Sequence, residues 1–151
     1  MGAQRNVITA VLDGELYQRG QILSWKRAQK EALLLEYDID IVVNFWPKLD
    51  PDMSDLPCWY WYMPSESIEM MDEKMWRMAR TLSTLIQKDK CTALILCEAG
   101  KTRSVFFTCL VLYQICPQQA AQIIRNVFPG HRMKPYMVEH LEVLNLRYGA
   151  K

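Results

Sequence analysis

The residues best suited to chemistry in this sequence lie together in the segment 97–104, which reads Cys-Glu-Ala-Gly-Lys-Thr-Arg-Ser. A cysteine thiolate is a strong nucleophile, and an arginine guanidinium presents two parallel N–H donors that match two oxygens of a phosphate group. Five residues separate Cys97 from Arg103. The sequence therefore puts a nucleophile and a fixed cation on one loop that is short enough to surround a phosphate group.

The elements on either side of this loop must position it. The apolar run 92–96 has the length and composition of a fully buried strand, and Val105–Gln114 predicts a buried helix. Between a strand and a helix, the backbone N–H groups of a short glycine-containing loop converge on one point, and the positive end of the helix dipole adds to them. The same field favours the thiolate form of Cys97.

We therefore expect the loop to hold an anion, with Ser104 closing it by donating a hydrogen bond to the Cys97 sulfur. The expected phosphate-binding residues are those between the nucleophile and the helix: Glu98, Ala99, Gly100, Lys101, Thr102 and Arg103.

The rest of the chain alternates between strand and helix patterns, which predicts an α/β domain. The predicted strands are Val7–Val11, Glu15–Gln18, Ile39–Phe45 and Cys58–Met63, in addition to the run before Cys97. An Asp13-Gly14 turn signal separates the first two strands.

Two further helices are predicted. Ser24 is the expected N-cap of a helix running from Trp25 to about Tyr37, with its inner side formed by Ala28, Ala32, Leu33 and Leu35. A second stripe recurs at helical spacing and predicts core positions: Met71, Met75, Met78, Leu82 and Leu85.

Composition indicates a single globular domain over residues 1–151. The chain has 151 residues, of which 50% are hydrophobic, so it can bury a sizeable core without a metal or a disulfide. Its five cysteines lack paired spacing and no secretory signal is evident, which predicts reduced thiols and a cytoplasmic location. A net charge of +1 gives no general attraction to nucleic acid or to a membrane surface.

The segment Leu96–Ser104 resembles the signature loop of the dual-specificity and tyrosine phosphatases, in which His-Cys, five residues, Arg and then Ser or Thr form the catalytic site. Weaker similarities extend over nearly the whole chain, at 13–20, at 39–45 and from 117 to 135. The resemblance implies a central twisted, mostly parallel sheet of four to five strands flanked by helices.

The activity implied by this resemblance is hydrolysis of phosphate monoesters through a phosphocysteine, with no metal or other cofactor. Cys97 would attack phosphorus, Arg103 and the loop amides would stabilise the charge on the oxygens, and Ser104 would stabilise the departing thiolate. The expected partners are a phosphorylated protein or a small phosphate ester, and the expected state is a monomer.

Two features depart from the family pattern. Leu96 stands where the family has histidine, which removes one support for the loop and its thiolate. Ser67 takes the position of the family's acidic residue, so the adjacent Glu66 is the preferred general acid. The alternatives are Asp50, Asp52 and Asp55 in the preceding loop, or no side-chain acid at all.

Several readings stay open at this point. Lys101 suits a polyanionic ligand such as a phosphoinositide, although Glu98 offsets its charge. A pseudophosphatase that binds phosphorylated partners without turnover is the main alternative. A nucleotide-binding P-loop is less favoured, because its first glycine would fall at Ile95, inside the strand.

Other residues have simpler expected roles. His131 and His140 are not needed by the mechanism, and Cys109 and Cys116 are expected in the core. Cys58 or Cys91 is a candidate resolving thiol.

Overall fold

The fold is seen in a computed structural model that describes residues 8–20, 22–45, 50–54, 73–97, 103–128 and 135–149. Within these residues, four strands form one sheet in the order β1-β2-β4-β3: β1 Thr9–Leu12, β2 Leu16–Gly20, β3 Ile41–Phe45 and β4 Ala93–Cys97. β1 pairs antiparallel with β2, whereas β2 and β3 both pair parallel with β4. The predicted α/β fold with a mostly parallel sheet is confirmed, and β4 lies inside the sheet.

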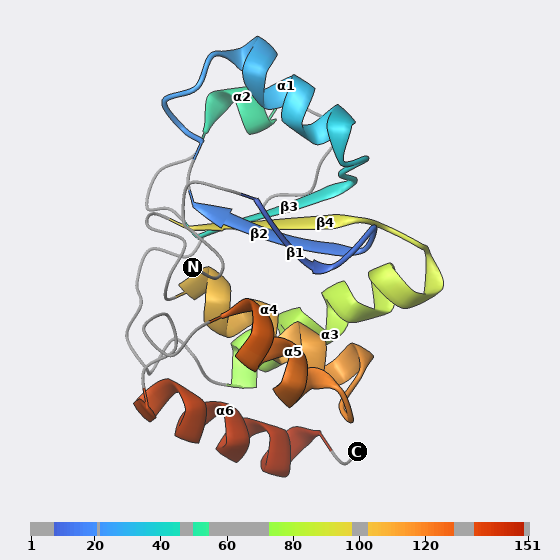
Figure 1. The fold of residues 1–151 in the computed structure, drawn as a ribbon, viewed down its shortest axis with the longest axis vertical. Helices are drawn as coiled ribbons and strands as arrows, with labels where there is room; N and C mark the ends of the chain where they lie inside the picture. The colour runs from blue at the N-terminus through green and yellow to red at the C-terminus, as the bar shows by residue number, and fades with distance from the viewer. Residues whose placement is uncertain are drawn as a thin grey trace.

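Helices cover both faces of this sheet (Figure 1). The helices α1 (Arg27–Glu36) and α2 (Pro51–Ser54) lie on one face. The opposite face carries α3 (Glu73–Lys88), α4 (Arg103–Ile115), α5 (Ala120–Val127) and α6 (Pro135–Tyr148). This arrangement explains why β3 and β4 are apolar except for Asn44, since parallel strands with helices on both sides have no solvent-facing side.

Side-chain alternation along the strands divides the core into two clusters. Ala93 and Ile95 of β4 belong to the cluster under α3 and α4, whereas Leu94 and Leu96 belong to the cluster under α1. The residues of α4 from Val105 to Leu112 are all fully buried. Phe107 of α4 packs on Phe45 at the end of β3, with ring centroids 5.3 Å apart. The start of α4 is therefore anchored to the sheet beside the end of β4.

The turn between β1 and β2 forms at the Asp13-Gly14 pair, as predicted. Gly14 has φ +79°, a conformation that residues with a Cβ rarely adopt. The backbone N–H of Glu15 donates to the carbonyl of Leu12 at 2.9 Å. The strands themselves are displaced by one or two residues from the predicted ranges.

The start of α1 was predicted wrongly, and of its four predicted inner positions only Leu33 is buried. The N-cap is Lys26, not Ser24, and the Gln29 side chain accepts a hydrogen bond from the Lys26 N–H at 3.0 Å. Leu35 is 77% exposed, and Ala28 and Ala32 are also exposed. The buried stripe is instead Lys30, Leu33 and Leu34. This face could not be predicted from the spacing of apolar residues, because one of its three buried residues is Lys30.

The stripe predicted over 71–85 is confirmed where the structure describes it. Met75 and Leu82 of α3 are fully buried, and Met78 and Leu85 are partly buried against the same cluster. Met71, the predicted strand Cys58–Met63 and the N-terminal residue Val7 lie outside the described residues.

Candidate functional site

The two residues predicted to carry the chemistry flank one loop. β4 ends at Cys97, and α4 begins at Arg103. Cys97 pairs with Gly20 at the carboxyl end of β2 and with Phe45 at the carboxyl end of β3. In open α/β sheets, ligands bind at the carboxyl ends of parallel strands. Cys97 therefore stands in the middle of the edge where such a sheet binds its ligand.

Arg103 and Ser104 are the first two residues of α4. Backbone N–H groups in the first turn of a helix have no partner within the helix, and the helix dipole is positive there. An anion between the end of β4 and the start of α4 would be stabilised by both. The remaining predicted phosphate-binding residues, 98–102, lie outside the described residues, as do Glu66, Ser67 and Asp55.

Leu96 lies in the apolar cluster under α1 and is 0% exposed. Its two neighbours across the sheet are polar: Arg19 of β2 on one side and Asn44 of β3 on the other. The position that carries histidine in the phosphatase signature is thus a buried apolar residue between two buried polar ones.

Buried charge is concentrated near this edge of the sheet. Among the residues that the structure describes, the buried charged side chains are Arg19, Lys30 and Asp50. Burying ionisable groups costs free energy, so such groups gather at functional sites more often than elsewhere. Neither Arg19 nor Lys30 was predicted at the site, because each stands in a segment whose pattern indicates only a structural role.

Arg19 lies one residue before the carboxyl end of β2. Its guanidinium stacks over the ring of Trp25 at 4.6 Å and donates to the Gly20 carbonyl at 3.4 Å. Burial lowers the pKa of Arg19 from its ordinary value. An arginine nevertheless keeps its charge in proteins. Within the described ranges no carboxylate forms an ion pair with it, so it brings a positive charge close to the Leu96-Cys97 strand end.

Asp50, an alternative general acid, is occupied by other contacts. Both of its carboxylate oxygens accept hydrogen bonds from Lys30 Nζ, at 3.0 and 2.9 Å, and its Oδ1 also accepts from the Asp52 N–H. Because the side chain is 1% exposed, this carboxylate is held inside the protein by its partners. The geometry argues against Asp50 as the acid, whereas Asp52, with a side chain 32% exposed, stays open.

The candidate resolving thiol Cys91 is in the wrong place. It precedes the amino end of β4, whereas Cys97 is at the carboxyl end. Five strand residues span about 13 Å between the first and last Cα at about 3.3 Å per residue. A disulfide requires Cα atoms about 4.4–6.8 Å apart, so these two thiols do not pair in this fold. The other candidate, Cys58, lies outside the described residues.

The remaining predicted positions are structural. Cys109 is fully buried in α4, and Cys116 is half-buried against the same cluster. The His140 ring stacks on Phe106 with centroids 5.7 Å apart, which makes it a helix-packing residue as expected. His131 lies outside the described residues.

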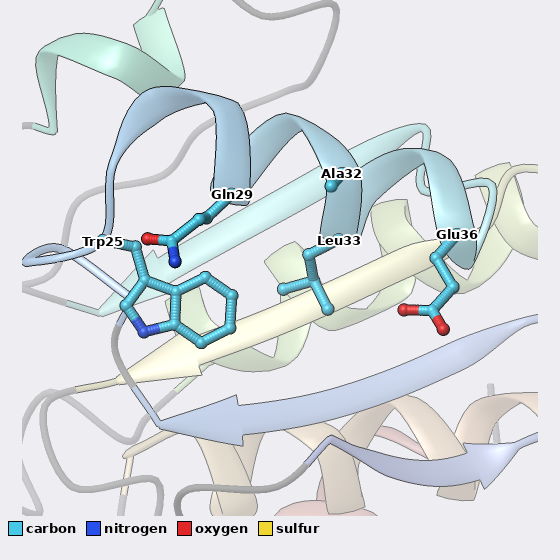
Figure 2. Close-up of a pocket in the computed structure, with 5 residues that line it drawn as sticks. All are labelled: Trp25, Gln29, Ala32, Leu33 and Glu36. Carbon is cyan, nitrogen blue, oxygen red and sulfur yellow. The ribbon is translucent and has the colours of Figure 1, made fainter.

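An open groove of about 310 Å³ runs beside α1 and is lined by Trp25, Gln29, Ala32, Leu33 and Glu36 (Figure 2). None of the predicted site residues lines it. In the part of the chain that the structure describes, no helix is long and apolar enough to cross a membrane, and no three side chains of metal-ligating type gather.

Neither a family model nor a curated protein matches this sequence. Solved structures do. Human DUSP28 matches with TM-score 0.69 and 13% identity, over 99% of each chain. The human tyrosine phosphatase-like serine/threonine/tyrosine-interacting protein matches with TM-score 0.71 and 14% identity, over 93% of this chain and 97% of its own.

A third match is P. aeruginosa TpbA in complex with pTyr, with TM-score 0.62 and 15% identity over 93% of this chain and 87% of its own. The fold is that of the dual-specificity and tyrosine phosphatases. At identities this low, the likeness establishes the phosphatase fold and not the activity.

Proposed function

We propose that this chain is a cysteine-dependent phosphatase that hydrolyses phosphate monoesters through a phosphocysteine intermediate. One observation carries the proposal. A cysteine ends the inner parallel strand, an arginine begins the buried helix that follows, and five residues join them. The phosphatase fold supports it, as does the complex of TpbA with pTyr.

The reaction has two steps. The Cys97 thiolate attacks phosphorus, an S–P bond forms, and the P–O bond to the leaving group breaks while an acid protonates the leaving oxygen. Water then attacks phosphorus and gives a proton to the conjugate base of that acid, and the S–P bond breaks to release phosphate and thiolate. The N–H groups of residues 98–102 and the Arg103 guanidinium bind the phosphate oxygens in both steps, and Ser104 stabilises the departing thiolate.

Glu66 is proposed as the acid, with Asp52, Asp55 or no side-chain acid as alternatives. General acid catalysis contributes about 10²- to 10⁴-fold, so a site without a side-chain acid would still turn over activated esters. The scheme needs no metal or other cofactor.

The proposed substrates are phosphotyrosine, phosphoserine or phosphothreonine in proteins, or a polyanionic phosphate that Lys101 would favour. We further propose that the chain acts as a single catalytic domain, as a monomer and in the cytoplasm.

A pseudophosphatase is the second candidate. The residue before the nucleophile, Leu96, is fully buried and apolar where the family has histidine. One structure with the same fold is that of the human tyrosine phosphatase-like serine/threonine/tyrosine-interacting protein. Such a protein would bind phosphorylated partners at the same loop without completing turnover.

Hydrolysis of p-nitrophenyl phosphate in EDTA and reductant tests the proposal. The unmodified protein should turn over and Cys97→Ser should not, whereas Cys91→Ser, at the other end of β4, should keep the activity. Turnover that survives in Cys97→Ser contradicts the mechanism. A folded unmodified protein that binds vanadate without turnover supports the pseudophosphatase instead.

A further inference from the structure

A cavity of about 210 Å³ lies among α3, α4 and α6, which cover the face of the sheet opposite α1 and its groove (Figure 1). Its lining includes Trp76 and Arg80 of α3, Tyr113 and Gln114 of α4, and Asn145 of α6. The α4 residues belong to the last turn of that helix, about 15 Å along its axis from its first residue, so the cavity is separate from the loop before α4. Pockets for drug-sized ligands measure about 300–1,000 Å³, so a ligand here would be a small molecule.

Trp76 is the buried residue of this lining, 2% exposed, and forms its floor. Its indole N–H has no hydrogen-bond partner among the described residues. An indole nitrogen can only donate, and a buried donor without an acceptor costs free energy. Gln114 Nε2 donates to the backbone carbonyl of Trp76 at 3.2 Å and so ties α4 to α3 beside the indole. An oxygen atom of a ligand at the cavity floor would satisfy the indole N–H and leave this contact intact.

Arg80 contributes a positive charge at the rim of the cavity, where it is exposed. Its Nη2 donates to the Tyr148 carbonyl at 3.4 Å, and within the described ranges it forms no ion pair with a carboxylate. A guanidinium has five N–H donors, so most of them are left for a ligand. None of the residues described around the cavity is an aspartate or a glutamate. The lining therefore favours an oxyanion, which a guanidinium binds with two parallel hydrogen bonds.

The carboxyl ends of α4 and α6 weaken the attraction for a bare anion. Each helix end is equivalent to roughly half a negative charge, and the contact of Arg80 with the Tyr148 carbonyl offsets part of it at α6. Apolar contact must therefore add to the ion pair, and the lining offers it at the Tyr113 ring and at Pro117. Burial raises the pKa of Tyr113, so its hydroxyl is uncharged at neutral pH and does not repel an anion.

We propose that this cavity binds a small aromatic carboxylate. The carboxylate would accept hydrogen bonds from the Arg80 guanidinium and the Trp76 indole, and the aromatic ring would lie against Tyr113 and Pro117. This binding site is additional to the proposed phosphatase site, and it stands whether or not the Cys97 loop turns over phosphate.

The test is a titration of the full ¹⁵N-labelled chain with sodium benzoate, followed by NMR. The sequence has five tryptophans, and the indole N–H signal of Trp76 is the one that Trp76→Phe removes. This signal should move downfield and saturate with a Kd on the order of 1 mM, as expected for so small a ligand, while the other indole signals stay in place. Benzamide keeps the ring without the charge, and acetate keeps the charge without the ring. Each should bind at least about tenfold more weakly than benzoate.

Arg80→Met tests the charge. Arg80 is exposed, so the variant should keep its fold, which the same spectrum checks. It should bind benzoate about tenfold more weakly, a loss of about 1.4 kcal/mol. The matched control is Arg77→Met, which removes a guanidinium that pairs with Glu73 at 2.8 Å and lies outside the cavity lining. The control should bind benzoate as the unmodified protein does.

Three results would overturn the proposal. One is a Trp76 signal that does not move at benzoate concentrations up to about 50 mM, well above the expected Kd. Another is equal affinity for benzoate in Arg80→Met and Arg77→Met. The third is benzamide or acetate binding as tightly as benzoate, which would contradict the assignment of an aromatic carboxylate without relying on any variant.

Discussion

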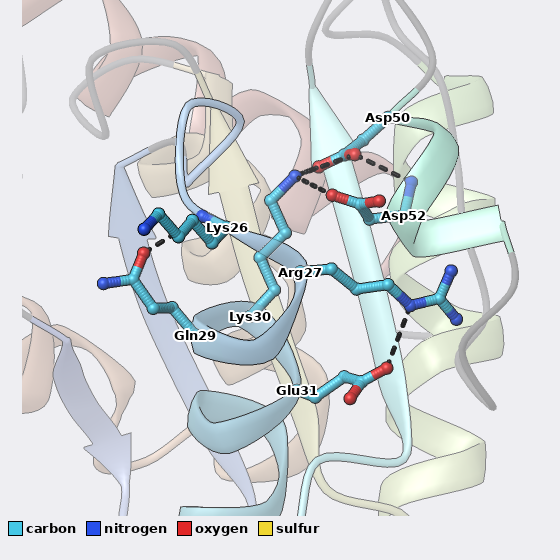
Figure 3. A network of polar contacts seen from close by, with 7 residues as sticks. All are labelled: Lys26, Arg27, Gln29, Lys30, Glu31, Asp50 and Asp52. Atoms are coloured by element: carbon cyan, nitrogen blue, oxygen red, sulfur yellow. Dashed lines mark hydrogen bonds and ion pairs between the residues drawn. The ribbon is translucent and has the colours of Figure 1, made fainter.

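Replacing Arg19 by methionine should make the Cys97 thiol less reactive. Arg19 is 8% exposed and pairs in register with Leu96, the residue before the nucleophile. Methionine keeps an apolar stem at this buried position, and the substitution removes the guanidinium and its charge. Lys30 is ion-paired with Asp50 and Asp52 (Figure 3), which leaves Arg19 as a cation without an ion-pair partner among the described residues on this face of the sheet.

The expected magnitude follows from the strand geometry. Neighbouring strands lie about 4.8 Å apart, and the Arg19 side chain extends a further side-chain length out of the sheet to Trp25, so the guanidinium is on the order of 9 Å from the end of β4. A unit charge at ~9 Å and an effective dielectric constant of ~20 stabilises an anion by roughly 1.8 kcal/mol. Since 1.4 kcal/mol corresponds to about a factor of ten, the thiolate fraction should fall about ten- to twentyfold on the acidic side of its titration.

Alkylation by iodoacetamide measures this without requiring turnover. The rate of modification of the Cys97 peptide is followed by mass spectrometry between pH 4 and 9, for the unmodified protein, Arg19→Met and Arg19→Lys. The pH profile of Arg19→Met should move to higher pH, and that of Arg19→Lys should stay near the unmodified protein. A folded Arg19→Met protein with an unchanged profile would refute the electrostatic argument.

Three further outcomes are expected. Leu34→Ala should lower the free energy of unfolding in urea by about 2–5 kcal/mol, whereas Leu35→Ala should change it by less than about 0.5 kcal/mol, since only the first side chain is buried; equal effects would contradict the assigned face of α1. The raised pKa of Lys30 means that its charge stabilises the fold fully below the ordinary lysine value of 10.5, and this contribution is lost as pH rises through the folded-state pKa. The stability difference between the unmodified protein and Lys30→Met/Asp50→Leu should therefore stay constant between pH 6 and 9 and fall at strongly alkaline pH, and a change between pH 6 and 9 would be inconsistent with it. Burial raises the pKa of Cys109, so its thiol should resist Ellman's reagent in the native protein and react after unfolding; rapid labelling of native protein would contradict its place in α4.

Much of this fold could be predicted because two of its parallel strands, β3 and β4, are short and largely apolar runs. Ile39–Phe45 and 92–96 were recognisable as buried strands, and the apolar stretch after Arg103 as a buried helix. The order of strand, loop and helix around Cys97 followed directly from the last two of these segments.

The charged part of the sheet edge could not be predicted in the same way. Lys30 is buried because Asp50 and Asp52, twenty and twenty-two residues further along the chain, fold back onto it. In an apolar pattern a lysine is expected to face solvent. The inner side of α1 was therefore predicted to include Ala28, Ala32 and Leu35, which are exposed. Arg19 was missed for a related reason, since nothing local in the sequence marks its contact with Trp25.

The central claim is that Cys97 forms a covalent bond to phosphorus. Unmodified protein mixed with p-nitrophenyl phosphate and quenched in denaturant within the first turnover should carry phosphate on the Cys97 peptide by mass spectrometry, and Cys97→Ser and unmixed protein should carry none. Turnover with no phosphate on that peptide, or with phosphate on another residue, would contradict the account.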